Sequence, residues 1–176
     1  MTTLQQITRD LHTQAERSDL MQCLLRGHMS KQMWADMLYT QYVIFRAIET
    51  RTSFEVAELH RAQRALNDWQ ALACSLPPCC LPSLDALAAR IATCDAQQLW
   101  AHVYVHYLAL LYGGQIIRRL LPTDVPTTLF DFADADACKT HVRSHVDIHL
   151  ADEACESFRL TIEYYNELYR CHQKHS

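Results

Sequence analysis

The sequence predicts an all-α protein, because its composition and its hydrophobic pattern both favour long helices. Nearly half of the 176 residues are hydrophobic, yet the chain contains only three glycines and five prolines. Leu, Ala, Gln and Arg, which favour helices, are abundant, and no segment shows the alternating pattern of a half-buried strand. A chain of this length can bury one hydrophobic core. We therefore expect a single domain, 1–176, built as a bundle of about eight helices.

Capping residues and helix breakers divide the chain into the predicted helices. They cover about residues 3–15, 18–27, 30–50, 55–74, 83–93, 95–121, 133–149 and 152–172. Ser18 and Ser30 are N-cap residues, and Gly27 ends the short helix between them. From residue 34 to residue 48, apolar side chains recur at the spacing of one helix face. Pro77 and Pro78 end the fourth helix, because proline is incompatible with a helix interior.

The helices of the second half begin at polar residues. Ser83 opens one of them, and Asp95 with Gln98 three residues later resembles a capping box. The helix that follows, to about Leu121, is the most apolar of the chain. Polar residues and glycines interrupt it, so we expect a buried helix and no membrane span. Pro122 and Pro126 mark the loop before the last two helices.

Charge and cysteine content exclude several classes of protein. The net charge is −4 and the basic residues are scattered, whereas nucleic-acid binding needs a clustered basic face. The polar start predicts that there is no signal peptide. Eight cysteines in such a chain predict free thiols in a reducing compartment, and hence a cytoplasmic protein. Cys74, Cys79 and Cys80 lack the paired Cys-x-x-Cys spacing that is typical of zinc sites.

The adjacent glycines Gly113 and Gly114 interrupt a strongly helical segment. Each glycine inside a helix costs about 1 kcal/mol relative to alanine. We expect the helix to bend there and to expose backbone that a flat ligand can approach closely. Tight packing against another helix, or a loop at this position, is the alternative explanation of the pair.

His12 and Glu16 lie at i and i+4, on one face of the first predicted helix. A carboxylate in this place can hold one imidazole nitrogen and leave the other for a metal. His12 is therefore a candidate ligand, although a lone histidine on a helix is more often a surface or core residue.

These two motifs resemble those of the haem oxygenase family, of the biliverdin-producing type. Residues 101–115, AHVYVHYLALLYGGQ, resemble the distal helix, which passes over the haem in that family. Residues 11–16, LHTQAE, resemble its proximal-histidine motif, and the order and spacing of the two motifs also agree. Residues 59–61 and 68–69 resemble a further segment more weakly. The resemblance implies that His12 is the axial ligand of the haem iron and that Glu16 orients it.

The resemblance also implies which residues contact the haem propionates. Lys139 and Arg143, at i and i+4, match the propionate-contacting helix of the family, and Arg9 and Tyr104 match polar positions near the haem edge. A solvated face is the alternative for the two cations, with Arg143 paired to Asp147. A further basic position of the family is occupied by Gln5 in this chain.

Other residues have a structural alternative beside the functional one. Phe158, Thr161 and Tyr165 of the last helix resemble residues of the pocket wall in the family. A role in the core would also explain all three. The histidines of the seventh predicted helix recur every four residues, about 200° round the helix from Lys139 and Arg143. We interpret these histidines, which are His141, His145 and His149, as surface or partly buried residues, and a metal site is the alternative. His102, within the distal motif, is interpreted as structural.

Three positions of the distal side depart from the family pattern. An aspartate that organises the waters for proton delivery is Leu110 here, a tyrosine of the long helix is Phe45, and an arginine is His106. Tyr112 and His106 are the candidates to replace this network, each by holding a water. Gly113 and Gly114 are expected to admit oxygen and to steer it to one edge of the haem.

The sequence therefore predicts a haem oxygenase with an atypical distal helix. Haem would be both substrate and cofactor, and an external ferredoxin or flavoprotein reductase would supply the electrons. The products would be a biliverdin-type tetrapyrrole, CO and Fe²⁺. One alternative is a haem carrier, store or sensor without catalysis, which Leu110 and Phe45 favour. Another is a metal-dependent oxidase without porphyrin, for which the sequence shows no clear pair of ligand-bearing helices.

Overall fold

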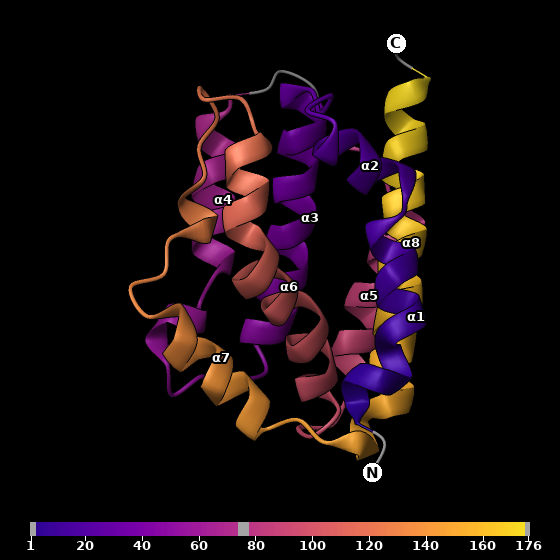
Figure 1. Ribbon diagram of the computed structural model, residues 1–176, viewed down its shortest axis with the longest axis vertical. Coiled ribbons are helices and arrows are strands. Elements are labelled where there is room, and N and C mark those ends of the chain that lie inside the picture. Colours follow the sequence, from indigo (N-terminus) through magenta and orange to yellow (C-terminus); the bar gives the residue numbers. More distant parts are fainter. Residues whose placement is uncertain (1–2, 74–77, 175–176) are drawn as a thin grey trace.

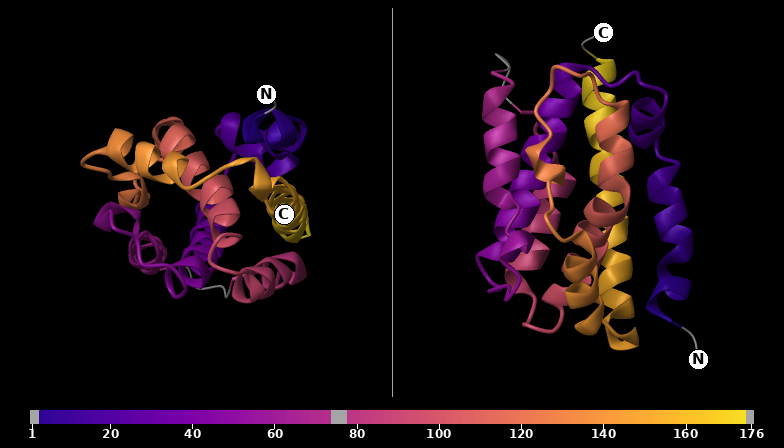
Figure 2. Two further views of the ribbon diagram at one scale, coloured as in Figure 1. Left: turned by 90° about the horizontal axis from the view of Figure 1, so that it is seen from below. Right: turned by 60° about the vertical axis from the view of Figure 1, so that its left-hand side comes forward.

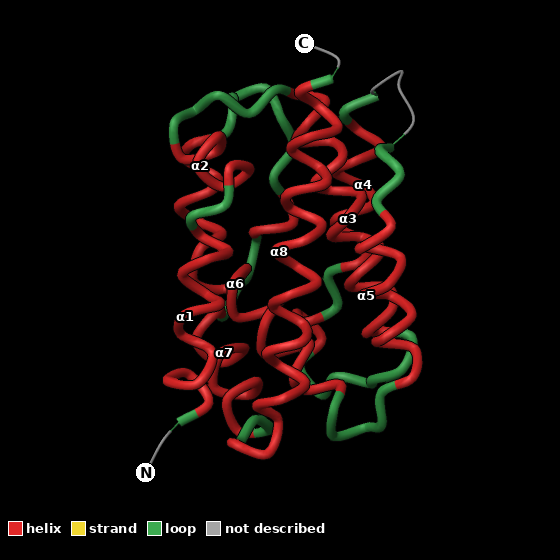
Figure 3. Tube along the Cα trace, turned by 90° about the vertical axis from the view of Figure 1, so that its right-hand side faces the viewer, coloured by secondary structure: helices red, strands yellow, loops and turns green. Residues whose placement is uncertain are grey.

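The computed structural model describes residues 3–73 and 78–174, and this part of the chain consists of helices and loops (Figure 3). The α-helices are α1 (Leu4–Glu16), α2 (Asp19–Leu25), α3 (Lys31–Glu49), α4 (Ala62–Ala71), α5 (Pro82–Thr93), α6 (Leu99–Leu120), α7 (Ala135–Ser144) and α8 (Ala151–Gln173). The short 3₁₀ helices are η1 (Ala57–Leu59), η2 (Thr128–Phe130) and η3 (Ile148–Leu150). The all-α class and the eight helices are confirmed.

Side-chain caps explain where most of the helices begin. Ser18 and Ser30 accept hydrogen bonds from the first turns of α2 and α3, as predicted. Thr3 and Gln6 form a capping box at the start of α1. Asp95 accepts hydrogen bonds from the backbone ahead of α6 and donates its own N–H to the Gln98 side chain, 3.0 Å away. The predicted capping interaction is confirmed, although α6 itself begins at Leu99.

Two predicted helices are shorter than expected, because acidic side chains cap the backbone inside them. The Glu49 carboxylate accepts hydrogen bonds from the backbone N–H groups of Arg61 and Ala62, at 2.6 and 2.9 Å. These bonds satisfy the first turn of α4, which begins at Ala62 and not at residue 55. In the same way, Asp147 caps η3 by accepting from the backbone of His149, so α7 ends at Ser144.

Helix α6 lies in the middle of the bundle (Figure 2, left). It packs against α7 on one side and α8 on the other. Helix α8 also contacts α1 and α5, and α1 runs along it at one side of the molecule (Figure 1). A large core fills the space around α3, and a smaller one joins α1, α6 and α8. The smaller core places α1 beside the first half of α6.

The segment around η2 is held against the bundle by two buried polar residues of the weaker sequence motif. Asp68 accepts hydrogen bonds from the Thr128 hydroxyl and from the backbone N–H of Leu129, at 2.7 and 2.8 Å. Arg61, only 1% exposed, donates to the backbone carbonyl of Asp131 at 2.7 Å. These bonds fix the chain that carries Phe130 onto α6.

A disulfide joins Cys79, in the loop before α5, to Cys171 in the last turn of α8. The expectation of free thiols is therefore wrong for these two residues, because the fold brings residues 92 positions apart in sequence into contact. Cys74, from the cysteine group considered above, lies outside the described residues. Free thiols are found at Cys23, Cys80, Cys94, Cys138 and Cys155.

In the described part of the chain, every helix is too short or too polar to cross a membrane. This finding includes α6, whose apolar residues contact the rest of the bundle.

Candidate functional site

His12 lies on the outer part of α1, where a ligand can reach its ring. The His12 side chain is 54% exposed, and its Nδ1 atom lies 3.6 Å from a carboxylate oxygen of Glu16. The edge of the ring faces Phe158 of α8, with the ring centroids 6.0 Å apart. Because Glu16 approaches Nδ1, Nε2 is the nitrogen that points away from the carboxylate and suits a metal. The structure thus brings together three residues that the sequence singled out.

Helix α1 is tied to α6 one turn before His12. The Thr8 hydroxyl lies 3.2 Å from the hydroxyl of Tyr104, which belongs to the distal motif. Thr8 is buried and also donates to the backbone carbonyl of Leu4. Arg9 follows on the exposed face of α1. This contact therefore links α1 to the first half of α6.

The two glycines of α6 serve different steric purposes. A Cβ atom added at Gly113 would meet no atom within 4 Å, whereas one at Gly114 would lie 2.7 Å from the ring of Phe130. Phe130 is buried and stacks on Trp34, so its ring has little room to move. Gly114 is therefore explained by packing, and Gly113 leaves an open approach to the backbone. Helix α6 continues through both glycines, and the expected bend stays a prediction.

Tyr112 brings the two predicted propionate partners together. Lys139 Nζ lies 4.8 Å and Arg143 Cζ 5.3 Å from the centroid of its ring, which holds both cations by its negative face. Lys139 also pairs with Asp136 at 2.9 Å. The alternative pairing of Arg143 with Asp147 on one helix is excluded, because α7 ends before Asp147. An exposed aromatic ring that contacts two cations thus belongs to the residue next to Gly113 in the chain.

His106 belongs to a chain of hydrogen bonds between α5, α6 and α8, which is buried except at Arg90, whose side chain is 47% exposed. Arg90 donates two bonds to Glu153, at 2.9 and 2.6 Å, and Glu153 lies 2.9 Å from His102 Nε2. His102 Nδ1 lies 3.0 Å from the Ser157 hydroxyl, which in turn lies 3.3 Å from His106 Nε2. Since an ionised carboxylate only accepts, His102 donates through Nε2, Ser157 donates to His102, and His106 donates to Ser157. The acceptor nitrogen of His106 is therefore Nδ1.

Burial controls the charge of this network. Burial, with a smaller contribution from the charge of His102, lowers the pKa of His106 to about 3. Burial also lowers the pKa of His102, against the opposing effect of Glu153. The hydrogen bonds from Arg90 hold the pKa of Glu153 below its usual range. Both histidines are therefore neutral at pH 7, and the role of His106 toward oxygen stays a prediction.

The other departures of the distal motif are buried apolar side chains. Phe45 is fully buried, and its ring centroid lies 4.8 Å from that of Tyr107 on α6. Leu110 and Leu111 are each 7% exposed and belong to the main core. At about 100° per residue, Leu110 lies roughly 60° round the helix from Gly113, while Leu111 lies roughly 160° away. Leu110 is thus the leucine nearer to the open glycine.

The histidines of the seventh helix lie at the surface or are partly buried, as predicted. His141 is half-buried and His145 is exposed, and both contact the ring of Trp100. His149 is exposed and falls in η3, beyond the end of α7. The three residues are therefore not a continuous stripe on one helix.

Two groups of side chains in the described residues have the spacing of metal ligands, and both lie apart from His12. One is Cys94, His102 and Glu153, where Arg90 already neutralises the carboxylate. Burial there raises the pKa of the Cys94 thiol to about 12, which disfavours the thiolate that a metal needs. The other group is Asp36, Cys79 and His172. Neither has the paired carboxylate-and-histidine helices of a two-metal oxidase.

Comparison with known proteins agrees with this arrangement. Residues 1–163 match the model of the family described as Heme oxygenase. "Heme oxygenase 1" of the cyanobacterium Synechocystis is 24% identical over an alignment of 199 positions, which covers 94% of this chain and 82% of the relative. "Heme oxygenase 2" of the same organism is 26% identical over an alignment of 149 positions, which covers 71% of this chain and 59% of the relative. This second match therefore spans less than two thirds of the relative.

Solved structures share the fold. The structure of heme oxygenase-1 from Synechocystis in complex with heme superposes with a TM-score of 0.79 at 23% identity, covering 97% of this chain and 92% of the other. The heme oxygenase of Leptospira interrogans also gives a TM-score of 0.79, at 22% identity, over 93% of this chain and 97% of the other.

Alanine substitutions at the two glycines should change stability in opposite directions. Alanine favours a helix over glycine by about 1 kcal/mol, so Gly113→Ala should raise the free energy of unfolding by roughly 0.5–1 kcal/mol. Gly114→Ala forces a methyl group against Phe130 and should lower that free energy by about 1–2 kcal/mol. Urea unfolding of the ligand-free variants measures both values. Equal effects would contradict the steric division between the glycines.

The neutral state of His106 should make the fold sensitive to acid. Its folded pKa lies below the unfolded value of about 6.5, so the unfolded chain takes up a proton first as the pH falls. The resulting stability is complete above about pH 6.5 and should decrease by about 2 kcal/mol between pH 7 and pH 5. In His106→Gln this part of the pH dependence should disappear, as measured by urea unfolding at both values. The exposed control His149→Gln should behave like the wild type, and identical slopes in all three proteins would refute the assignment.

Proposed function

The chain belongs to the haem oxygenase family, and we propose that it binds haem through His12 and oxidises it with O₂ and electrons from an external reductase. The products would be a biliverdin-type tetrapyrrole, CO and Fe²⁺, and the electron donor would be a ferredoxin or a flavoprotein reductase. The proposal includes a cytoplasmic location. The observation that carries it is the accessible ring of His12, with Glu16 at its Nδ1 atom and Phe158 beside it.

The residues present fit haem on both its iron and its propionate sides. His12 offers Nε2 to the iron, and the open space at Gly113 allows the backbone of α6 to approach a flat ring. Lys139 and Arg143, beside the exposed Tyr112, offer cations to the propionates. Arg9 and Tyr104 would add polar contacts at the haem edge, and Phe158 would form part of the wall. When bound, haem supplies the iron that activates oxygen and is itself the substrate.

The side chains of the chain would then orient the reactants and manage protons. Glu16 holds Nδ1 of His12 and so fixes the direction of Nε2. Gly113 has no side chain that would block oxygen, and Gly114 allows α6 to pack closely against Phe130. His106, whose Nε2 donates to Ser157, presents Nδ1 as an acceptor for a water. Tyr112 would offer its hydroxyl to the same waters.

A second candidate function is haem binding without turnover, as a carrier, store or sensor. Two observations favour it: Leu110 is a buried apolar residue beside Gly113, and Phe45 is fully buried against Tyr107. Neither side chain can organise water for proton delivery.

Hemin added to the purified protein, followed by a reductase system, separates the two functions. A bilin band supports the oxygenase, and a Soret band that persists under turnover selects the carrier.

His12→Ala should abolish the shift of the Soret band that hemin shows on binding to the wild type, because it removes the axial ligand. The measurement is a hemin titration of the ligand-free variant, followed by absorption. His149→Ala, at another exposed histidine outside the proposed site, should keep the wild-type band. A wild-type Soret band in His12→Ala would overturn the haem site as proposed.

Leu110→Asp should increase the rate of bilin formation, since it restores a carboxylic acid near Gly113. Leu111→Asp is a matched control, because the two leucines are equally buried but Leu111 faces away from Gly113. Both variants should lose stability, by about 2–4 kcal/mol, from burying a polar group in the core. Single-turnover spectra with a reductase system measure bilin formation. Equal rates in both variants would show that the acid at this position does not limit turnover.

A further inference from the structure

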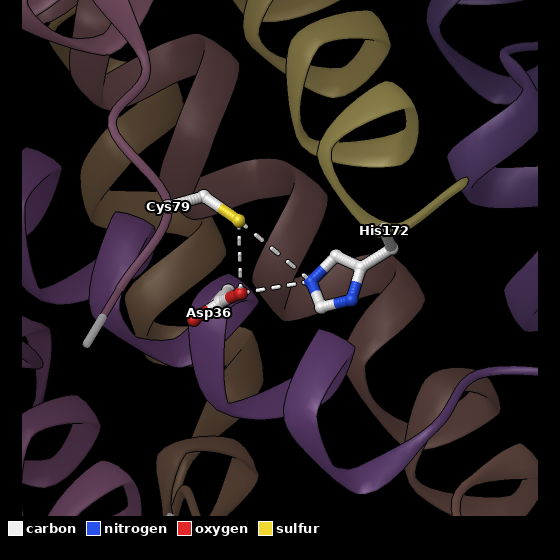
Figure 4. A group of neighbouring side chains, drawn as sticks. All are labelled: Asp36, Cys79 and His172. Atoms are coloured by element: carbon white, nitrogen blue, oxygen red, sulfur yellow. Dashed lines mark hydrogen bonds and ion pairs between the residues drawn. The ribbon is translucent and has the colours of Figure 1, made fainter. Parts of the chain in front are cut away.

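Three side chains from distant parts of the sequence meet at the end of the bundle near the C-terminus (Figure 4). Asp36 lies on α3, Cys79 in the loop before α5, and His172 in the last turn of α8. His172 Nε2 lies 2.8 Å from Asp36 Oδ2, and Cys79 Sγ lies 3.3 Å from the same oxygen. The distance from Cys79 Sγ to His172 Nε2 is 4.0 Å. The three donor atoms thus form a small triangle.

The dimensions and chemistry of this triangle suit a divalent metal ion. A tetrahedral zinc ion with bonds of about 2.0–2.3 Å keeps its donor atoms roughly 3.3–3.8 Å apart, within the range of the distances above. Thiolate, imidazole and carboxylate are the donor types that zinc takes in proteins. Asp36 is only 2% exposed, so its charge needs compensation by hydrogen bonds or by a cation.

The surroundings would orient the ligands and admit an ion. Gln32 donates to the second oxygen of Asp36 at 3.3 Å and so holds the carboxylate plane, as outer partners of metal ligands do. A cavity of about 350 Å³ lies between α2, α3 and α8, and His172 forms part of its lining. Cys23 and Met33 line the same cavity. An ion can therefore reach the imidazole from one side of the bundle.

The disulfide between Cys79 and Cys171 decides whether this site can work. A sulfur atom in a disulfide is not a thiolate and does not bind zinc. A dithiol reductant changes this by supplying two electrons and two protons. The S–S bond breaks, the reductant becomes a disulfide, and Cys79 and Cys171 become thiols. A metal can then displace the proton of Cys79 and bind its sulfur.

We propose that Asp36, Cys79 and His172 form a metal site of the zinc type, closed by the Cys79–Cys171 disulfide and opened by its reduction. In the oxidised protein the disulfide fastens the loop before α5 to α8. In the reduced protein the bound metal ion links the same loop to α8 through Cys79 and His172, and it also links both to α3 through Asp36. The site is independent of haem, because its residues lie on other elements than His12 and Gly113.

Two serine variants test the site, because both remove the disulfide but only one removes the ligand. Cys171→Ser should bind Zn²⁺ without any reductant, since Cys79 is then always a thiol. Cys79→Ser should bind at least about 100-fold more weakly, because loss of an outer partner alone costs roughly 10- to 100-fold. Competition with a chromophoric chelator measures the affinity, and Co²⁺ reports the thiolate bond by its charge-transfer absorption. Equal affinities in the two variants would overturn the proposal.

Further measurements cover the wild type and the other thiols. Wild-type protein is reduced by a dithiol, and the dithiol is then removed. This protein should bind one more equivalent of Zn²⁺ than the oxidised protein. The midpoint of its thermal unfolding should rise when Zn²⁺ is added. Asp36→Asn should lose this binding, and Cys80→Ser, at the exposed neighbouring cysteine, should retain it. If a serine variant does not fold, zinc binding by the reduced wild type, compared with the oxidised wild type, still tests the proposal. No difference in zinc binding between the reduced and oxidised wild type would refute the proposal that the disulfide controls the site.

Discussion

The arrangement of both sides of the proposed site depends on the buried hydrogen-bonded chain from Glu153 to His106, which the exposed Arg90 joins to α5. Through Glu153 and Ser157, α8 holds two histidines of α6 and so fixes how the two helices lie along one another. The residue after Ser157 on α8 is Phe158, which contacts His12 on α1. Two turns beyond His106 on α6 is Gly113, on nearly the same face. This network, together with the bond between Thr8 and Tyr104, therefore determines the relative position of His12 and Gly113.

Packing on a neighbouring face of α6 complements this network. Asp68 and Arg61 hold the chain around η2, and Phe130 from that chain fills the space that a side chain at Gly114 would need. The helix is thus held by polar bonds on one face and by an aromatic ring on another. Gly113 lies on nearly the same face as His106, two turns further along, and a Cβ atom there would meet no atom within 4 Å. The open backbone at Gly113 is what a ligand lying over α6 requires, and its cost to the helix is about 1 kcal/mol.

Local sequence patterns predicted most of the helices, because caps and apolar spacing act within a few residues. Ser18, Ser30 and Asp95 cap the helices as expected. The errors came from interactions across long sequence distances. Glu49 caps α4 from twelve residues or more away, and so residues 55–61 are not part of that helix. The contact between Cys79 and Cys171 is likewise invisible in the spacing of neighbouring cysteines, and the free-thiol expectation failed there.

The sequence by itself determined the helical class and the pairing of His12 with Glu16, since helix periodicity sets which residues share a face. It also marked Gly113 and Gly114, because two glycines inside a helix carry a cost that needs a reason. Only the tertiary structure decided which reason applies to each glycine, since the answer is the distance to Phe130 on another element. In the same way, only folding places Asp36 and His172 beside Cys79. Side chains that meet from three separate elements leave no periodic trace along the chain.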